Sequence, residues 1–385
     1  MLDLGISSDL GDEVVTSLYI KNGRNSLGKT LEVLIVDGKI SQVAPELTDI
    51  QADQTIDLEG KSYVSAGWID DHVHCYEKLS LYYDEPDQVG YKTGVTTVID
   101  AGSTGADNIG DFYQLTRNKK TNVYAMINIS KTGILAQNEL ADLDKLQFEP
   151  LQQAITDYSD FIVGLKARIS KSVVVDKGLK PLMIAKDFQQ RLMAKLPLMV
   201  HVGTNPPELS EILAVMEAGD ILTHCYNGKT NGILNSDDKI KEFVYQARDR
   251  GIIFDIGHGS DSFNFHTATT AVQNQVLPQS LSTDIYHKNR ELGPVYNMAT
   301  CIEKMLWLGF DLAEVIPMIT TVPAQSFDLK KKGRLQPGFD GDLTIFNMET
   351  GTKELTDSDG FNKQTHTLVK PLYSVINGVA YEIGE

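Results

Sequence analysis

The stretch GWIDDHVH, residues 67–74, decides both the fold and the chemistry of this chain. It is a short strand-like run that ends in two histidines, His72 and His74. In a β-strand, side chains two residues apart point to one face, so both imidazoles can bind the same ion. A histidine at a strand end is more often structural, and a metal site therefore needs further ligands elsewhere in the chain.

The middle of the chain, from about residue 64 to 329, alternates short apolar runs with amphipathic stretches of helical length. This alternation is typical of βα units. We predict a (β/α)8 TIM-like barrel, with a doubly wound open sheet as the alternative. Its strands are expected at residues 63–74, 96–103, 122–130, 160–170, 196–203, 220–227, 251–259 and 279–286. Helices are expected at residues 181–196, 209–218, 238–250 and 296–308.

Both ends of the chain have a different pattern, in which short β-branched runs are separated by turn signals such as Asn22-Gly23 and Asn377-Gly378. These are hairpin signals. We predict that the two end segments pair into one small β-sandwich domain. The predicted boundaries are 1–62 and 334–385 for the two parts of the β-domain and 63–333 for the barrel.

Composition places the chain among globular proteins. Of its 385 residues, 42% are hydrophobic and 23% are charged, close to the average for folded domains. The 35 Lys and Arg against 52 Asp and Glu give a formal net charge of −17, which repels nucleic acid and anionic lipid. We expect a small-molecule substrate, and neither nucleic acid nor a membrane as partner.

The cysteines and the N-terminal residues predict a cytoplasmic protein. Cys75, Cys225 and Cys301 are an odd number in a long chain, which is typical of reduced thiols. Residues 1–15 are acidic and lack the basic and apolar segments of a secretory signal. No run approaches the ~18 apolar residues of a membrane helix.

Polar residues in the predicted strands gather near their carboxyl ends, where a parallel barrel places its chemistry. Beyond the first histidine pair they are Lys166, His201, His224 and Asp284. Imidazoles with a carboxylate suit Zn2+, and Mn2+ or Fe2+ are alternatives. Lys166 stands in a mostly apolar strand, where a buried ammonium is costly. It therefore either has a metal or anionic partner, which includes an ordinary ion pair, or extends its ammonium to the surface.

The motifs GWIDDHVH, GLKA, HVG, THCYNG, STDIY and PGFDGDLTIF together resemble the amidohydrolase superfamily of metal-dependent hydrolases. The resemblance covers nearly the whole chain, the β-rich ends included. It is strongest to a branch of dihydroorotase-like deacetylases whose members are often catalogued as dihydroorotase or adenine deaminase.

The resemblance implies two divalent metal ions. His72, His74 and Asp284 would bind the more buried ion, and His201 and His224 the more exposed one. Lys166 would join the two. An ordinary lysine is a cation, and in similar enzymes CO2 converts it to an anionic carbamate with one oxygen for each metal.

The resemblance also implies a mechanism and a function. A hydroxide held between the metals would attack a carbonyl, while Asp284 takes its proton and delivers it to the leaving group. We therefore expect a hydrolase that cleaves an amide or ester acyl group, foremost acetyl, from a small carboxylate-bearing N-acyl or O-acyl compound. The alternatives are a cyclic amidohydrolase similar to dihydroorotase and then an adenine deaminase. A non-catalytic scaffold is disfavoured because all six ligand positions are filled, and a homo-oligomer is expected.

Substrate contacts are expected at the mouth of the barrel. Arg168 lies two residues beyond Lys166 on the same face, where it binds a substrate carboxylate or pairs with a rim carboxylate of the protein. Asp70 precedes the histidine pair and would support the ligands from behind. Further candidates for substrate contact are Asn227, His258 and Ser282, with Ser130 and Tyr286 also near the mouth. Cys75 and Cys225 each follow a histidine and should point away from the metals.

Overall fold

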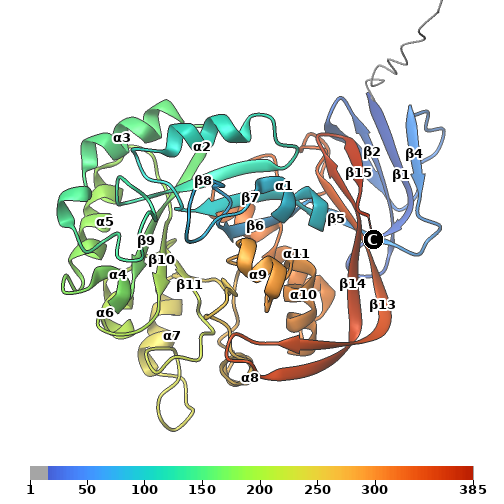
Figure 1. Cartoon of the computed structure of the whole chain (residues 1–385). Helices are drawn as coiled ribbons and strands as arrows, with labels where there is room; N and C mark the ends of the chain where they lie inside the picture. Colours follow the sequence, from blue (N-terminus) through green and yellow to red (C-terminus); the bar gives the residue numbers. More distant parts are fainter. Residues whose placement is uncertain (1–15, 385) are drawn as a thin grey trace, which may run out of the picture.

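The computed structural model describes residues 16–384 and builds them around two β-sheets (Figure 1). Residues 1–15, for which we predict no secretory signal, lie outside this range. The parallel sheet consists of β6 (Trp68–Val73), β7 (Val95–Ala101), β8 (Asn122–Asn128), β9 (Ile162–Ile169), β10 (Leu198–Val202), β11 (Ile221–Thr223) and β12 (Ile253–Phe254). The terminal sheet consists of β1 (Ser17–Arg24), β2 (Thr30–Val36), β3 (Lys39–Ala44), β4 (Gln54–Asp57), β5 (Tyr63–Ala66), β13 (Leu343–Thr356), β14 (Asn362–Ile376) and β15 (Val379–Glu382).

The strands of the parallel sheet lie in chain order, from β6 at one edge to β12 at the other, and every neighbouring pair is parallel. They are almost entirely buried, as expected where both faces of a parallel sheet are covered. Seven of the eight predicted strands are therefore present, in the predicted order.

The eighth predicted strand, 279–286, is not a strand of this sheet. Residues 280–285, here called the linking segment, make only isolated parallel bridges, Val73↔Ile285 to β6 and Asp255↔Ser280 beyond β12. Asp284 has a φ of 50°, a left-handed conformation that interrupts an extended ladder. Through these two bridges the segment still joins both edges of the sheet. At the β6 edge, the Asp284 N–H also donates to the His72 carbonyl over 2.7 Å.

The predicted first strand, 63–74, is divided at Gly67 between the two sheets. Its first half, β5, pairs with β13 of the terminal sheet, and its second half, β6, pairs with β7. The Gly67 N–H donates to the Asp342 carbonyl, and a side chain at this position would overlap Thr96. Glycine thus permits the close approach by which the chain passes from one sheet to the other.

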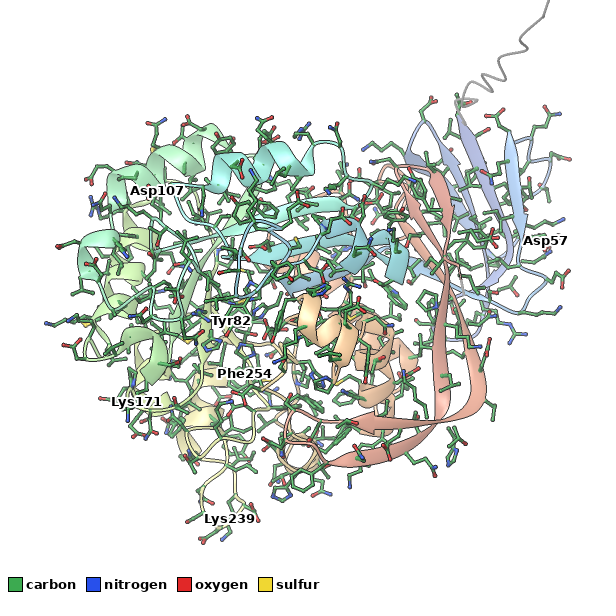
Figure 2. The ribbon with its side chains drawn as sticks, viewed as in Figure 1. Asp57, Tyr82, Asp107, Lys171, Lys239 and Phe254 are labelled. Atoms are coloured by element: carbon green, nitrogen blue, oxygen red, sulfur yellow. The ribbon has the colours of Figure 1, made fainter. Side chains whose placement is uncertain are left out.

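Helices cover the outside of the parallel sheet, and side chains fill the layer between them (Figures 1 and 2). The four helices predicted from sequence are present as α5, α6, α7 and α10, each shorter than predicted. The α-helices are α1 (Pro86–Val89), α2 (Ile109–Thr116), α3 (Phe148–Asp157), α4 (Lys171–Val174), α5 (Lys180–Arg191), α6 (Leu209–Val215), α7 (Glu242–Asp249), α8 (Phe265–Gln273), α9 (His287–Leu292), α10 (Met298–Trp307), α11 (Leu312–Met318) and α12 (Thr321–Ser326). The short 3-10 helices are η1 (Tyr91–Thr93) and η2 (Leu143–Lys145). Within residues 16–384, no helix combines the length and the apolar character needed to cross a bilayer.

The strands of the parallel sheet bury both faces. Leu198 and Val200 of β10 pack in the large core toward the helices, whereas Met199 between them packs with Ile69 and Phe327 in a smaller cluster on the other face. This alternation is the two-residue period of a strand. The small cluster fills the space at the amino ends of the strands and leaves the carboxyl ends for polar groups.

The terminal sheet joins both ends of the chain, as predicted, and its strands form one hydrogen-bonded sheet. Its packing as a β-sandwich stays a prediction. Its order is β15-β14-β13-β5-β1-β2-β3, with β4 also paired to β1. Its own apolar core includes Ile20, Val33 and Ile345. The hairpin of β13 and β14 continues beyond this sheet and bends toward α8 (Figure 1).

A buried carboxylate, Asp342, connects the two sheets. Its Oδ2 accepts from Lys332 Nζ over 2.6 Å and from Asn122 Nδ2 of β8 over 3.0 Å, and its Oδ1 accepts from the Asn377 N–H over 2.9 Å. The side chains of Asp342 and Lys332 are each 5% exposed. A buried charge pair with these extra hydrogen bonds is costly to break, because the remaining partner is left without compensation.

We expect Asp342→Ala to lower the free energy of unfolding by about 2–4 kcal/mol, because it removes the closer carboxylate partner of the buried Lys332 ammonium, which keeps only Asp340 at 3.1 Å, and the acceptor of Asn122 and Asn377. Urea titration followed by circular dichroism measures this change. The matched control is Asp187→Ala, which removes an exposed pair with Arg191 at 3.2 Å and should change stability by less than about 0.5 kcal/mol. Equal effects of the two variants would contradict the role of Asp342.

Candidate metal centre

Three of the predicted ligands form one compact cluster at the carboxyl end of β6. His74 Nε2 lies 3.2 Å and His72 Nε2 3.4 Å from Asp284 Oδ1, and one donor atom of each residue lies within 4.8 Å of the others. Both histidines are buried, whereas the Asp284 side chain is 19% exposed. Two imidazoles and a carboxylate at this separation fit a divalent cation such as Zn2+.

The remaining predicted ligands lie against this cluster. Lys166 Nζ is 3.0 Å from His72 Nε2, His224 Nε2 is 2.8 Å from His201 Nδ1, and the rings of His72 and His224 are 5.1 Å apart. The structure therefore brings together all six residues that the sequence analysis assigns to metal binding. Their individual roles remain predictions.

Three of the four predicted ligand histidines are oriented by a contact to one ring nitrogen, which leaves the other nitrogen free to face the centre. The contacts are His74 Nδ1 to Ser103 Oγ at 2.9 Å, His72 Nδ1 to Thr223 Oγ1 at 2.9 Å and His224 Nδ1 to the Gly257 carbonyl at 2.6 Å. Both hydroxyl residues are in turn bound to a carboxylate, because Ser103 donates its backbone N–H to Asp100 and Thr223 donates its hydroxyl to Asp255.

The electrostatics of the centre favour cation binding. Burial lowers the pKa of His72 and His201 well below the usual range and that of His224 to about 4. Burial alone would raise the pKa of Asp284. The hydrogen bond from His74 and nearby positive charges together lower the pKa by more than burial raises it, so the net shift is downward. At neutral pH the imidazoles of His72, His201 and His224 are neutral and the Asp284 carboxylate is charged, which are the forms that bind metals. Burial also lowers the pKa of Lys166 to about 7.

Two predicted ligands have a strained backbone. His224 has a φ of 65° and Asp284 a φ of 50°, values that cost a non-glycine residue of order 1–2 kcal/mol. The neighbouring Gly259 also has a positive φ, and a Cβ atom there would overlap Asp284 Oδ2. Close packing against a glycine therefore helps to define the position of Asp284.

Asp70 is hydrogen-bonded to the backbone on both sides of the centre, and its supporting role stays a prediction. It accepts from the Thr283 hydroxyl over 2.5 Å and from the Thr283 N–H over 3.1 Å, and so ties β6 to the linking segment. It also accepts from the His72 N–H over 3.3 Å.

Asp71 is a site residue that sequence reasoning missed. The β6–β7 register shifts between Asp70 and Val73, so Ile69 packs in the small inner cluster but Val73 packs toward the helices. Asp71 is buried, and among the described residues neither of its side-chain oxygens has a hydrogen-bond partner. Burial raises its pKa well above the usual range, and the charge of Asp255 adds to this effect.

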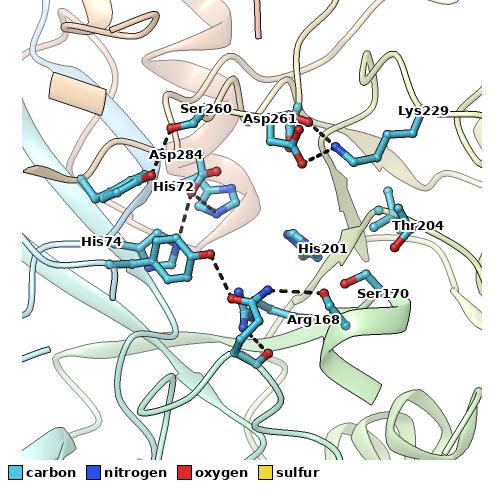
Figure 3. A pocket seen from close by; sticks show the side chains of 17 residues that line it. His72, His74, Arg168, Ser170, His201, Thr204, Lys229, Ser260, Asp261 and Asp284 are labelled. Carbon is cyan, nitrogen blue, oxygen red and sulfur yellow. Dashed lines mark hydrogen bonds and ion pairs between the residues drawn. The ribbon is translucent and has the colours of Figure 1, made fainter. Parts of the chain in front are cut away.

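A cavity of about 280 Å3 opens over the centre (Figure 3). His72, His74, His201 and Asp284 line it together with Arg168. Of the other predicted contacts, Tyr286 also lines it. The cavity residues that sequence reasoning missed include Tyr82, Gln137, Lys229, Ser260, Asp261 and Ser262.

Four of the predicted substrate contacts do not line this cavity, and one of them, Ser130, has its Oγ 3.1 Å from Thr132 Oγ1. Ser282 donates to Asp255 over 2.7 Å, Asn227 donates to the His224 carbonyl over 2.8 Å, and His258 Nε2 lies 2.7 Å from Lys304 Nζ. They hold strand ends and loops around the centre instead. Cys75 and Cys225 pack in the core toward the helices, as the alternation of strand side chains predicts.

Arg168 pairs with a carboxylate of the protein, one of the two predicted alternatives, and its contact with a substrate carboxylate stays a prediction. It lines the cavity, and it also forms a buried ion pair in which Nε and Nη2 each lie 2.7 Å from an oxygen of Glu139. Nη2 also donates to the Gln137 carbonyl over 2.9 Å. Glu139 lies in a loop with no regular pattern, so the sequence offered no signal for it.

Known proteins match this chain in sequence and fold. The model of the "Deacetylase-like composite domain" family matches residues 335–382. A deacetylase of Enterococcus faecalis is 52% identical over 95% of this chain and 99% of its own length. A solved structure described as an adenine deaminase is 52% identical with a TM-score of 0.93, and one described as a dihydroorotase is 31% identical with a TM-score of 0.86; each covers 95% of this chain and 99% of the other.

Identity of this extent over the full fold shows the class, which is that of the metal-dependent amidohydrolases. Within it, the chain belongs to the deacetylase family. The resemblance stated from sequence motifs is thereby confirmed.

We expect Gly259→Ala to lower kcat/KM by about 100-fold, because its methyl group would displace Asp284 and a shift of about 1 Å at a catalytic group costs this much. Steady-state hydrolysis by the metal-loaded protein measures the change. The matched control is Gly219→Ala, which also places alanine at a positive φ, +88°, but has no heavy atom within 4 Å of the added methyl group. Only Gly259→Ala should lose activity; similar activity in both variants would contradict the contact.

Proposed function

We propose that this protein is a binuclear metal-dependent hydrolase that removes an acyl group, most simply acetyl, from small N-acyl or O-acyl compounds that carry a carboxylate. The observation that carries the proposal is the convergence of six ligand-type residues on one centre beneath a cavity of about 280 Å3. The deacetylase of E. faecalis, with 52% identity over nearly its whole length, supports the same reaction.

The donor set suits two cations. His72, His74 and Asp284 would hold one ion and His201 and His224 the other, with Lys166 between them as a carbamate. The position of Lys166 Nζ, 3.0 Å from a ligand nitrogen in a buried centre, supports this role, because an uncompensated ammonium in such a place is costly. When bound, the two cations would lower the pKa of a shared water and polarise the acyl carbonyl.

The protein itself would move the proton. Asp284 lies at the floor of the cavity with one oxygen against His74, and Gly259 packs against its other oxygen. In this position it can accept a proton from the attacking water and return it to the leaving nitrogen or oxygen. The outer contacts of the histidines hold the centre in place while this happens.

Arg168 would recognise the substrate carboxylate. Its ion pair with Glu139 fixes the guanidinium at the cavity wall. Because Nε and Nη2 already donate to Glu139 and to the Gln137 carbonyl, Nη1 is the nitrogen that would bind the substrate carboxylate. The cavity is at the small end of the range for ligand sites, ~300 Å3, which favours a compact substrate.

We also infer that the parallel sheet closes into a (β/α)8 barrel. The linking segment bridges β6 on one side, and on the other its Ser280 carbonyl accepts from the Ile256 N–H over 3.2 Å, just beyond β12. This is the eighth position of such a barrel.

Deamination of adenine is the second candidate, favoured by the solved structure of that description at 52% identity. A panel of N-acetyl and O-acetyl carboxylates, dihydroorotate and adenine, assayed with Zn2+ or Mn2+, separates the possibilities. We expect acetate release with a kcat/KM of at least ~10⁴ M⁻¹s⁻¹ for the best acetyl compound. Ammonia release from adenine alone, or ring opening of dihydroorotate alone, would contradict the proposal.

We expect Lys166→Ala to lose bound metal and to fall at least ~1000-fold in activity, because the bridging anion is removed. Metal analysis of the purified variant and acetate release measure the two effects, and added bicarbonate should partly restore both. The matched control is Lys186→Ala. Lys186 is also a buried lysine, with its Nζ 2.7 Å from Asp220 Oδ2, but it does not line the cavity. Full metal content and activity in Lys166→Ala would refute the bridge.

A further inference from the structure

The tip of the β13–β14 hairpin lies against a loop of the metal centre. The hairpin tip is residues 357–361, and the site loop is residues 257–264, which follow β12. The Ser358 N–H donates to the Phe263 carbonyl over 2.9 Å, and Ser358 Oγ accepts from the Phe263 N–H over 3.1 Å. The same hydroxyl donates to the Gly259 carbonyl over 3.0 Å. One serine therefore binds the loop at both of its ends.

Two carboxylates of the hairpin tip extend this contact. Asp357 Oδ1 accepts from backbone N–H groups of its own turn, while its Oδ2 accepts from the Phe265 N–H over 3.0 Å. Asp359 Oδ2 accepts from Asn264 Nδ2 over 2.7 Å. A side chain at Gly228 would also overlap Asp359, so the tip reaches the loop after β11 as well.

The site loop touches two of the proposed metal ligands and forms part of the cavity wall. The Gly257 carbonyl contacts His224 Nδ1 over 2.6 Å, and Gly259 packs against Asp284. Between Gly259 and Phe263, the loop contributes Ser260, Asp261 and Ser262 to the cavity lining. A displacement of this loop would therefore move both a ligand and the wall.

The hairpin is anchored close to its tip, so the contact is held from both sides. Lys304 Nζ of α10 donates to the Thr356 carbonyl over 2.7 Å and lies 2.7 Å from His258 Nε2. Glu303 on the same helix accepts from Lys353 Nζ over 2.7 Å and from the Val369 N–H over 3.0 Å, and so binds both strands.

We propose that Ser358, with the hairpin tip around it, is a positioning residue of the metal centre, which holds the site loop so that Gly257 and Gly259 set the positions of His224 and Asp284. The inference deepens the proposed hydrolase function of the same centre and rests on it for its kinetic consequence. It gives the end of the chain a part in a site built on the parallel sheet.

The test compares Ser358→Ala with the conservative Ser358→Thr, which keeps the hydroxyl, both as metal-loaded full-length protein. Ser358→Ala should raise the amide exchange rate of residues 257–265 about tenfold or more and lower kcat/KM for the best substrate by about tenfold or more. Ser358→Thr should recover most of both. The matched control is Thr352→Ala, an exposed position on the same hairpin whose hydroxyl contacts only His366 among the contacts described.

Exchange is measured without substrate, so the inference and the proposed function can fail separately. If the wild-type protein hydrolyses none of the acyl compounds, the proposed function fails. The inference is then tested by the apparent Kd for Zn2+ in place of kcat/KM, and we expect Ser358→Ala to bind Zn2+ about tenfold more weakly. Loop exchange within twofold of wild type would overturn the inference. Faster exchange or a lower Tm with unchanged kcat/KM and Zn2+ affinity would also overturn it, because the contact would then be structural only.

Discussion

The metal centre depends on one constraint, which is that the two edges of the parallel sheet must meet. The histidines of β6 stand at one edge and the proposed acid–base residue, Asp284, arrives on the linking segment beyond the other. The backbone hydrogen bond from Asp284 to His72 and the side-chain bonds from Thr283 to Asp70 make this junction. Without it, a carboxylate and two imidazoles that are 210 or more residues apart would not share a site.

The candidate centre contains backbone strain and buried ionisable groups. Asp284 and His224 adopt left-handed conformations, and the interior beneath them holds Asp255, Asp71 and Lys166 with little solvent. Such an arrangement is unfavourable by itself. Bound cations would offset it, since they would neutralise the carboxylates and hold the strained ligands in place.

Much of the fold and the proposed ligand set could be predicted from the sequence because strand ends carry a simple signal. His72, His201 and Lys166 each interrupt an apolar run close to its end, and the topology of a parallel sheet brings such ends together. Asp100 and Asp255 carry the same signal, in VIDAG and IIFDIG, and could have been predicted as supports for the ligand histidines.

The remaining features depend on local geometry that leaves no periodic pattern. The register shift in β6 lies at Asp71, between Asp70 and Val73, and no rule of alternation reports such a shift. Glu139 and Ser358 lie in irregular segments whose positions follow from tertiary packing alone. Likewise, the linking segment has the composition of a strand but not its conformation, because Asp284 must turn its carboxylate toward the histidines.

The terminal sheet has a consequence for how the molecule is made. β5 hydrogen-bonds to β13, so residues 63–66 cannot form this pairing until residues 343–346 have been synthesised. Such pairing across almost the whole chain is slow to form, since the loop between the partners must first be ordered. During synthesis, β5 therefore presents an open strand edge until the last strands leave the ribosome, and a chain that ends before β13 keeps an unpaired edge that favours aggregation.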